Sequence, residues 1–254
     1  MGLSPQCAAD TAGLKGLLET EYASGQQTLT PGRAFYAAAK ENSGRLEWYP
    51  AMADLAGSGD LGFTSGPWIY TTAVSGTPVH GHFLTIWKRD AMCRWRAEFD
   101  GGISHAAPAN REPKLEPDQA WVTKRSAPPP QLIADDAVSR AISDFRDTAR
   151  QDGFASGLRT YARTADFRFY MDGALPMGLA AANRYFTGHA VPGGWKEGAR
   201  GRSYDSTLAY SVGEFSDANH GNHAYAELWQ YDPRVANWGL RILLIGPPAP
   251  LMSK

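Results

Sequence analysis

The feature that most constrains this chain is a pattern of aromatic residues and glycine that occurs once in each half. The matching stretches lie 142 to 147 residues apart: Asp60–Trp68 with Thr207–Phe215, Phe83–Trp87 with Tyr225–Trp229, and Trp95 with Trp238. Each half therefore reads as a strand, a turn, a strand that ends in Trp, a turn that contains Asp, and a strand that opens with Trp. An internal repeat of this length predicts two copies of one folding unit.

Between the two halves lies a proline-rich stretch of mixed charge, which includes the run Pro128–Pro130. Such a composition is typical of a semi-rigid, extended linker. We therefore predict a first domain over residues 1–107, a linker over 108–130 and a second domain over 131–254. Domains of this size can each bury an apolar core of their own.

In each half, helical patterns come before strand patterns. In the second half we predict a helix over Asp135–Gln151, a short helix over Gly157–Ala162, a strand over Arg168–Met171 and a helix over Leu179–Phe186, because apolar residues recur there at helical or strand spacing. In the first half, Pro31 in the first turn predicts a helix through Lys40. Helices followed by hairpin-linked strands indicate an α+β fold with helices on one face of an antiparallel sheet.

The composition excludes several classes of protein. The chain has 254 residues, 25 Lys and Arg against 26 Asp and Glu, and a net charge of -1, so it lacks the positive field of a nucleic-acid or membrane-surface binder. No apolar stretch is long enough for a membrane span, and the first residues show no export signal. Its two cysteines cannot form a disulfide framework or a four-ligand metal knot. We expect a soluble protein, either cytoplasmic or exported.

Three segments of the first half, Asp60–Trp68, Gly81–Lys88 and Trp95–His105, resemble the DUF4440 branch of the NTF2-like superfamily. The second half is similar through Gly153–Phe154, Asp172–Pro176 and Trp229–Trp238. That superfamily includes ketosteroid isomerases and SnoaL-type polyketide cyclases. The resemblance implies two tandem cones, each a curved sheet wrapped around helices with a pocket between them, associated as an internal pseudo-dimer.

One departure from the family concerns the start of the chain. The family places about three dozen residues between its opening helix and the segment that matches Pro31–Lys40, whereas only Gly13–Thr30 is available here. We therefore expect the first cone to be shortened at its N-terminal, helical part.

The resemblance implies a carboxylate in an apolar cavity, where desolvation sets whether it acts as a base or as a neutral donor. Asp100, on the last strand of the first domain, holds the matching position and is our catalytic candidate, with His82 as an acid–base partner. The alternative is that Asp100, which stands before Gly101 and Gly102, only forms a turn at the strand end. The second domain has Leu243 at the corresponding position, so only one half could use this carboxylate.

Glu227 and Arg241 lie on neighbouring predicted strands of the second domain. A cross-strand ion pair is the simpler interpretation, and an anion-binding site is the alternative. A buried Arg241 would need either Glu227 or the carboxylate of a ligand as its partner.

The histidines occur in pairs at matching hairpins. Asp217, His220 and His223 form a D-x-x-H-x-x-H pattern, but spacing by three in a loop fixes no ligand geometry, so we predict a polar turn and no metal. For His82 the alternative to acid–base chemistry is a solvated hairpin side chain. No phosphate loop, nucleophile elbow or Cys–His dyad is present, and we expect no cofactor.

Aromatic residues recur in both halves, and packing in the core is their default role. Some of them could line a pocket for a small apolar ligand. Our ligand-binding candidates are Trp48, Phe63, Trp87, Tyr170, Tyr210, Glu227, Trp229 and Arg241.

Three functions stay open on the sequence. The first is a small-molecule-binding or scaffold protein without turnover, favoured because the fold motifs are duplicated and the charged candidates are not. The second is an isomerase, cyclase, dehydratase or epoxide hydrolase that acts on an apolar substrate through Asp100. The third is a protein-interaction module that uses an open strand face.

Overall fold

The computed structural model describes residues 44–72, 76–115, 136–162, 166–187, 193–217 and 221–248. The chain divides into two compact units, Met1–Ser126 with Ser203–Asp205 and Ala127–Arg202 with Ser206–Lys254. The helix predicted over residues 31–40 lies outside the described residues.

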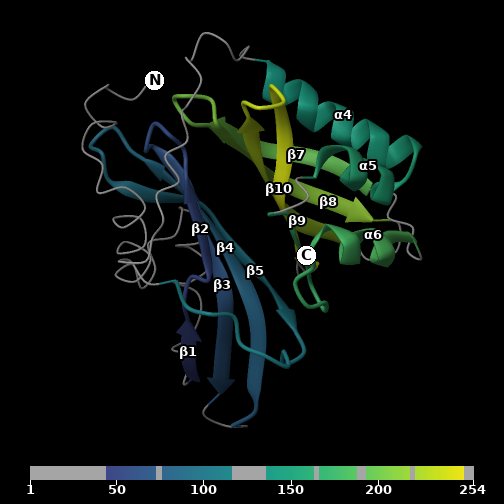
Figure 1. The fold of residues 1–254 in the computed structure, drawn as a ribbon. Coiled ribbons are helices and arrows are strands. Elements are labelled where there is room, and N and C mark those ends of the chain that lie inside the picture. Colours follow the sequence, from purple (N-terminus) through teal and green to yellow (C-terminus); the bar gives the residue numbers. More distant parts are fainter. Residues whose placement is uncertain are drawn as a thin grey trace, which may run out of the picture. The chain divides into compact units, whose positions relative to one another are not determined.

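The described part of the first unit is an antiparallel sheet (Figure 1). Its strands run in the order β1-β3-β4-β5, and the short β2 pairs with β3 beyond the end of β1. The strands are β1 (Gly44–Trp48), β2 (Met52–Leu55), β3 (Leu61–Thr72), β4 (Pro78–Arg89) and β5 (Trp95–His105). Between β4 and β5, Cys93 forms a disulfide bond and has a positive φ of 60°.

The second unit contains a five-stranded sheet in the order β6-β10-β9-β8-β7. Its β6 pairs parallel with β10, and the other pairs are antiparallel. The elements are α4 (Ala137–Gln151), α5 (Phe154–Tyr161), β6 (Arg168–Met171), α6 (Leu179–Thr187), β7 (Gly193–Arg202), β8 (Leu208–Asp217), β9 (Gly221–Asp232) and β10 (Asn237–Pro248). The three predicted helices and the predicted strand Arg168–Met171 of this half are present, with bounds within three residues of those expected, whereas β7 was not predicted.

The three helices lie over one face of that sheet (Figure 1). Helix α4 forms because Val138, Ile142, Phe145 and Ala149 recur at helical spacing and are buried. Phe145 lies at the centre of the core and makes edge-to-face contacts with four other aromatic rings: Phe154, Tyr161, Trp195 and Trp229. The α+β class predicted from the sequence is therefore confirmed.

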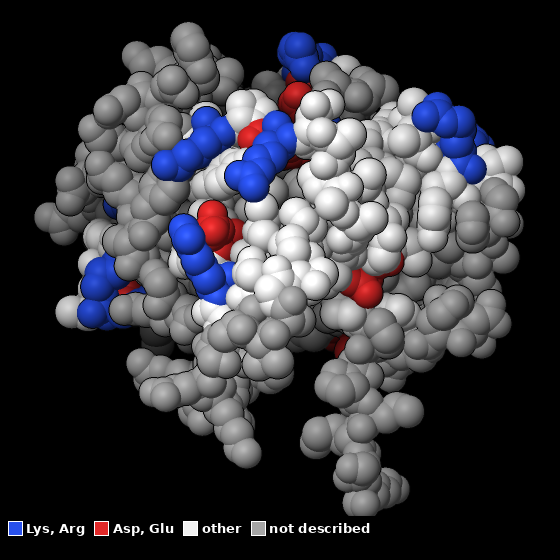
Figure 2. Space-filling model, turned by 90° about the horizontal axis from the view of Figure 1, so that it is seen from below, with Lys and Arg blue, Asp and Glu red and all other residues white. Residues whose placement is uncertain are grey.

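Charged residues are interspersed with uncharged ones on the face seen in Figure 2. None of the helices in the described ranges combines the length and the apolar character needed to cross a bilayer.

Candidate ligand-binding site

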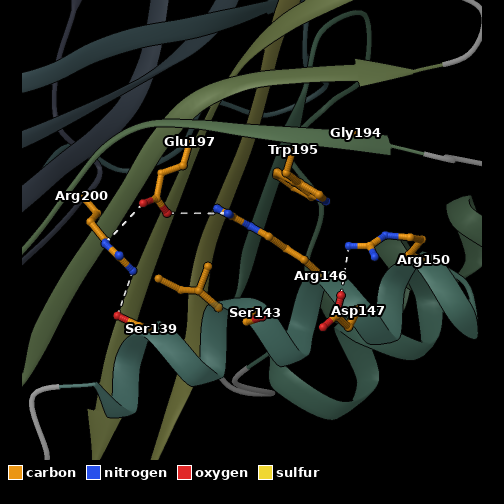
Figure 3. A pocket seen from close by; sticks show the side chains of 10 residues that line it. Ser139, Ser143, Arg146, Asp147, Arg150, Gly194, Trp195, Glu197 and Arg200 are labelled. Carbon is orange, nitrogen blue, oxygen red and sulfur yellow. Dashed lines mark hydrogen bonds and ion pairs between the residues drawn. The ribbon is translucent and has the colours of Figure 1, made fainter.

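A pocket of about 440 Å³ opens between α4 and β7 of the second unit (Figure 3). Helix α4 contributes one wall and β7 the other. The lining residues are Ser139, Ile142, Ser143, Arg146, Asp147, Arg150, Gly194, Trp195, Glu197 and Arg200. The pocket therefore combines one indole and one aliphatic side chain with several charged and hydroxyl groups.

Arg146 lies at the inner side of this pocket because of its position on the helix. It follows Ile142 by one turn and Val138 by two, and both of these side chains are buried, so the same face of the helix directs the guanidinium towards the sheet. Only 12% of the Arg146 side chain is exposed. Its guanidinium lies over the rings of Trp195 and Tyr225, 5.1 and 5.3 Å from their centroids.

Glu227, in the middle of β9, is fully buried and holds Arg146 in place. Arg146 donates from Nε to Oε1 at 3.3 Å and from Nη2 to Oε2 at 3.1 Å. The indole Nε1 of Trp229 donates to the same Oε2 at 3.2 Å. The carboxylate is thus matched by a bidentate guanidinium and an indole N–H, as a buried charge requires.

Burial raises the pKa of Glu227, and the neighbouring charge of Arg146 opposes that rise without cancelling it. For Arg146, burial acts to lower the pKa, but the charge and hydrogen bonds of Glu227 outweigh it and the pKa is raised. Arg146 therefore keeps its positive charge, and Glu227 is the member of the pair that takes up a proton as the pH falls.

A chain of hydroxyl groups extends from this pair to the pocket. Ser211 Oγ donates to Glu197 at 3.1 Å, so the Tyr225 hydroxyl, 3.0 Å from the same Oγ, must donate to Ser211. Arg146 Nη2 donates to both hydroxyl oxygens, at 2.9 Å to Ser211 and 2.8 Å to Tyr225. Burial raises the pKa of Tyr225, and its hydrogen bond with Ser211 and the charge of Arg146 oppose the rise. These groups form one connected polar network inside an otherwise apolar core.

The expected pair of Glu227 with Arg241 is not formed. Leu243 is the residue opposite Glu227, and Arg241 has no opposite residue on β9, because it is the extra residue of a β-bulge between Leu240 and Ile242. Arg241 donates instead to Gln230 at 2.8 Å and to Asp166 at 3.3 Å. Of the two charged candidates, only Glu227 belongs to the network beneath the pocket.

The other candidates of the second unit are core residues. Tyr170, Tyr210 and Trp229 are each at most 4% exposed, and none of them lines the pocket. Trp229 contributes to the site only through its N–H bond to Glu227.

In the first unit, Phe63 and Trp87 are buried and Trp48 is half-buried. The indole of Trp87 donates to Thr64 Oγ1 at 2.9 Å. These positions agree with the packing role and do not by themselves identify a ligand, so their ligand-binding role stays a prediction.

Asp100 lies within β5, which continues to His105, so it is not a turn former at a strand end. Thr85, opposite it on β4, donates to its carboxylate at 3.1 Å. Desolvation raises the pKa of this carboxyl and the Thr85 hydrogen bond opposes the rise, yet the residue is exposed to solvent. Water at this exposed position stabilises the charged form of the carboxylate. The catalytic role of Asp100 stays a prediction.

His82 is buried in β4, which contradicts the expectation of a solvated hairpin side chain. Its Nδ1 lies 2.7 Å from Nε2 of His105, and its Nε2 lies 3.6 Å from the carboxylate of Glu112. Because Nδ1 of His105 donates to the carbonyl of Ala106 at 2.7 Å, Nε2 of His105 must accept from His82 in the neutral pair. His82 thus forms a hydrogen-bonded pair with His105 and lies near Glu112, whereas the carboxylate of Asp100 is bonded to Thr85.

His220 lies outside the described residues. His223 is buried, and its Nδ1 lies 2.9 Å from the carbonyl oxygen of Gly246. The residues that the structure describes contain no cluster of three metal-ligating side chains.

None of the ten residues that line the pocket was among the sequence candidates; the missed residues include Arg146, Trp195, Glu197 and Arg200. Two signals could have identified part of this set. Trp195 matches Trp48 at the offset of 147 residues that relates the first strands of the repeat, and Arg146 continues the buried line of a predicted amphipathic helix, where a charge demands a partner.

No protein-family model and no curated protein matches this chain. Solved structures of part of its length are similar to it. An NTF2-like protein from Cytophaga hutchinsonii has 11% identity and a TM-score of 0.35, and the match covers 45% of this chain and 99% of that one. An NTF-2 like protein of unknown function from Shewanella oneidensis has 10% identity and a TM-score of 0.35, over 44% and 97% of the two chains.

A DUF4783 family protein from Bacteroides ovatus is also similar, with 16% identity and a TM-score of 0.32 over 40% of this chain and 91% of that one. The chemistry of the site between α4 and β7 follows from its own residues.

Proposed function

We propose that the second unit is an NTF2-like domain that binds a small molecule in the pocket between α4 and β7, without turnover. The observation that carries the proposal is the anchoring of Arg146, a pocket-lining cation, to a fully buried carboxylate, Glu227. Burial of an ion pair costs desolvation free energy. We attribute the presence of this pair to a binding role, in which one polar group must be held fixed at the inner wall of a cavity.

The size and lining of the pocket support this proposal. A volume of about 440 Å³ falls within the usual range for small-molecule sites, which combine apolar surface with a few fixed polar groups. Here Trp195 and Ile142 supply the apolar surface, and Arg146 supplies a polar group that packing and hydrogen bonds hold still.

The same ion pair supports binding without turnover. Glu227 is the buried carboxylate of this unit, but it does not line the pocket, and its oxygens accept hydrogen bonds from Arg146 and Trp229. A carboxylate held in this way would have to lose its Arg146 bonds before it could act as a general base on a bound molecule.

We further propose that the two units are tandem copies of one NTF2-like ancestor, of the DUF4440 type that the sequence resembles. The strand registers support this. Trp48 pairs with Trp68 in the first unit as Trp195 pairs with Phe215 in the second, and each pair is related by the same offset of 147 residues. On this alignment β1 and β2 together correspond to β7. The association of the copies as an internal pseudo-dimer stays a prediction.

Irregularities of the two sheets agree as well. The β4–β5 pair contains a bulge at Glu98, and the β9–β10 pair contains one at Arg241, in each case beside the repeated Trp, 87 or 229. Bulges are specific features of a fold and are preserved within families, so their shared position favours a common origin.

The repeated glycine provides a third agreement. A Cβ at Gly66 would stand 2.0 Å from the carbonyl oxygen of Tyr49, and a Cβ at Gly213 would stand 2.2 Å from that of Lys196. In both units the glycine has no side chain, so the backbone of the neighbouring segment, at Tyr49 or Lys196, can approach closely. In both cases the strand pairing is irregular near this point.

The binding proposal is tested by screening a small-molecule collection for thermal stabilisation of the full chain, followed by calorimetric titration of each hit. Ser143, an exposed residue on the pocket wall, is replaced in a Ser143→Trp variant that fills the pocket. The matched control is Asp144→Trp, at the next and equally exposed position of the helix, which does not line the pocket. We expect hits that bind the parent and the control but not Ser143→Trp. A screen without hits, or hits that bind Ser143→Trp equally well, would refute the proposal.

A further inference from the structure

The guanidinium of Arg146 presents one edge to the pocket. Its Nε and Nη2 are engaged with Glu227, Ser211 and Tyr225. Its Nη1 lies 3.6 Å from Glu197, which is an ion pair but too long for a hydrogen bond. Within the described part of the chain no atom accepts a hydrogen bond from Nη1, so this nitrogen has donors to offer a ligand.

A second guanidinium stands on the opposite wall. Arg200, on β7, donates from Nη1 to Ser139 Oγ at 2.8 Å, and its Nε lies 3.3 Å from Glu197 (Figure 3). Glu197 therefore stands between two arginines, with 29% of its side chain exposed. Glu197 thus shows that the two guanidinium groups can bind a carboxylate here, that is, a planar group with two negatively charged oxygens.

The charges that line the pocket are unequal. Three arginines face two carboxylates, because Glu227 lies beneath Arg146 and does not line the cavity. Arg150 is paired with Asp147 at 3.0 Å on the outer turn of α4, and Glu227 balances Arg146 from beneath the pocket. Arg146 and Arg200 both also lie against Glu197, which is partly exposed, so the carboxylate of a ligand can compete with Glu197 for these two guanidiniums.

Beside these cations the pocket has an apolar surface. Trp195 is half-buried and packs in the core against Phe145 and Phe215, so its ring is held rigidly. Ile142 is on the facing wall. A rigid indole beside a guanidinium suits a flat, apolar group that carries its charge at one end.

We propose that the pocket selects an organic monoanion: an aromatic or other flat apolar body with a terminal carboxylate that binds between Arg146 and Arg200. This inference rests on the proposed function, since it names the ligand class of the same pocket. It also refines the small, largely apolar ligand expected from the sequence to one that is apolar at one end and anionic at the other.

The experiment compares three probes of one shape by calorimetric titration of the full chain near neutral pH: phenylacetate, phenylacetamide and 2-phenylethylamine. We expect the carboxylate to bind about tenfold more tightly than the amide, because charge-assisted bonds to arginine are stronger than neutral ones, and the amine not to bind. Equal binding of the amide, or preference for the amine, would overturn the anion class while leaving a small-molecule site in place. Failure of all three probes to bind would overturn the anion class, whereas the pocket itself is judged by the screen with Ser143→Trp.

A variant pair makes the result specific to the site. Glu197→Gln removes the carboxylate that competes for Arg146 and Arg200, and we expect it to tighten phenylacetate binding about fivefold. Glu214→Gln makes the same change on β8, where the carboxylate pairs with exposed Lys196 outside the pocket, and should leave the affinity unchanged. Equal affinities in both variants, or a loss of affinity in Glu197→Gln, would contradict the proposal.

Discussion

Replacement of Arg146 by methionine isolates the value of the buried ion pair. Methionine retains most of the length of the side chain that packs between α4 and the sheet, and it removes every donor. Glu227 would then keep a single hydrogen bond, from Trp229 Nε1 at 3.2 Å, in a position with no exposure to solvent. Breaking a buried pair in this way costs about 3–5 kcal/mol of unfolding free energy, because one charge stays buried without compensation.

The loss depends on pH, and its direction follows from the pKa of Glu227. Burial raises this pKa, and Arg146 is the group that opposes the rise, so the variant raises it further. A carboxyl with a raised pKa binds its proton more tightly in the folded protein than in the unfolded one. The free energy of unfolding therefore decreases as the pH rises from the ordinary Glu value to the raised one. We expect Arg146→Met to be more destabilising at pH 8 than at pH 5.

The assay is equilibrium unfolding in urea, followed through the indole N–H signal of Trp229 in a ¹⁵N spectrum, which reports on the second unit alone. Adding Glu227→Gln to Arg146→Met removes the buried charge and keeps an acceptor for Trp229, so the double variant should lose only about 1–2 kcal/mol. The matched control Arg150→Met changes an arginine one turn along, 62% exposed, and should cost under about 1 kcal/mol. If the single and double variants are equally unstable at pH 8, uncompensated charge is not the cause.

Three further predictions concern the core of the second unit and the pair formed by His82 and His105. Gly213→Ala should cost about 1–3 kcal/mol in urea unfolding because its Cβ would collide with the Lys196 backbone, whereas Gly178→Ala, with no atom within 4 Å, should change stability by less than about 1 kcal/mol; equal effects would refute the reasoning. Phe145→Ala should cost about 3–5 kcal/mol by the same assay, and a smaller loss would mean that the surrounding rings close the cavity. Burial lowers the pKa of His105 despite its backbone hydrogen bonds, so stability present above about pH 6.5 should be lost as the pH falls; His105→Gln should flatten this dependence in thermal unfolding, and an unchanged slope would exclude His105 as its source.

The sequence predicted the strands and helices well because their signals are local. Apolar residues at helical spacing predicted α4, and the repeated aromatic pattern predicted β3, β4 and β5 in the first sheet and β8, β9 and β10 in the second, whereas β1, β2 and β7 were not predicted. The site was harder to predict, because the partner of Glu227 comes from a helix 81 positions earlier in the chain. Pairing Glu227 with Arg241 rested only on their positions on neighbouring strands, whereas the register places Leu243 opposite Glu227. No local pattern in the sequence indicates the register between two strands or the position of a bulge.

The two units differ in the acceptor of one buried indole. Trp87 of β4 and Trp229 of β9 each bury an indole N–H that needs an acceptor: Trp87 donates to the hydroxyl of Thr64, and Trp229 donates to the carboxylate of Glu227. A hydroxyl acceptor is neutral, so its burial requires no charged partner. A buried carboxylate demands a cation, and Arg146 of α4 supplies it. The cation that faces the pocket of the second unit is therefore a consequence of the carboxylate that accepts the hydrogen bond of one buried indole.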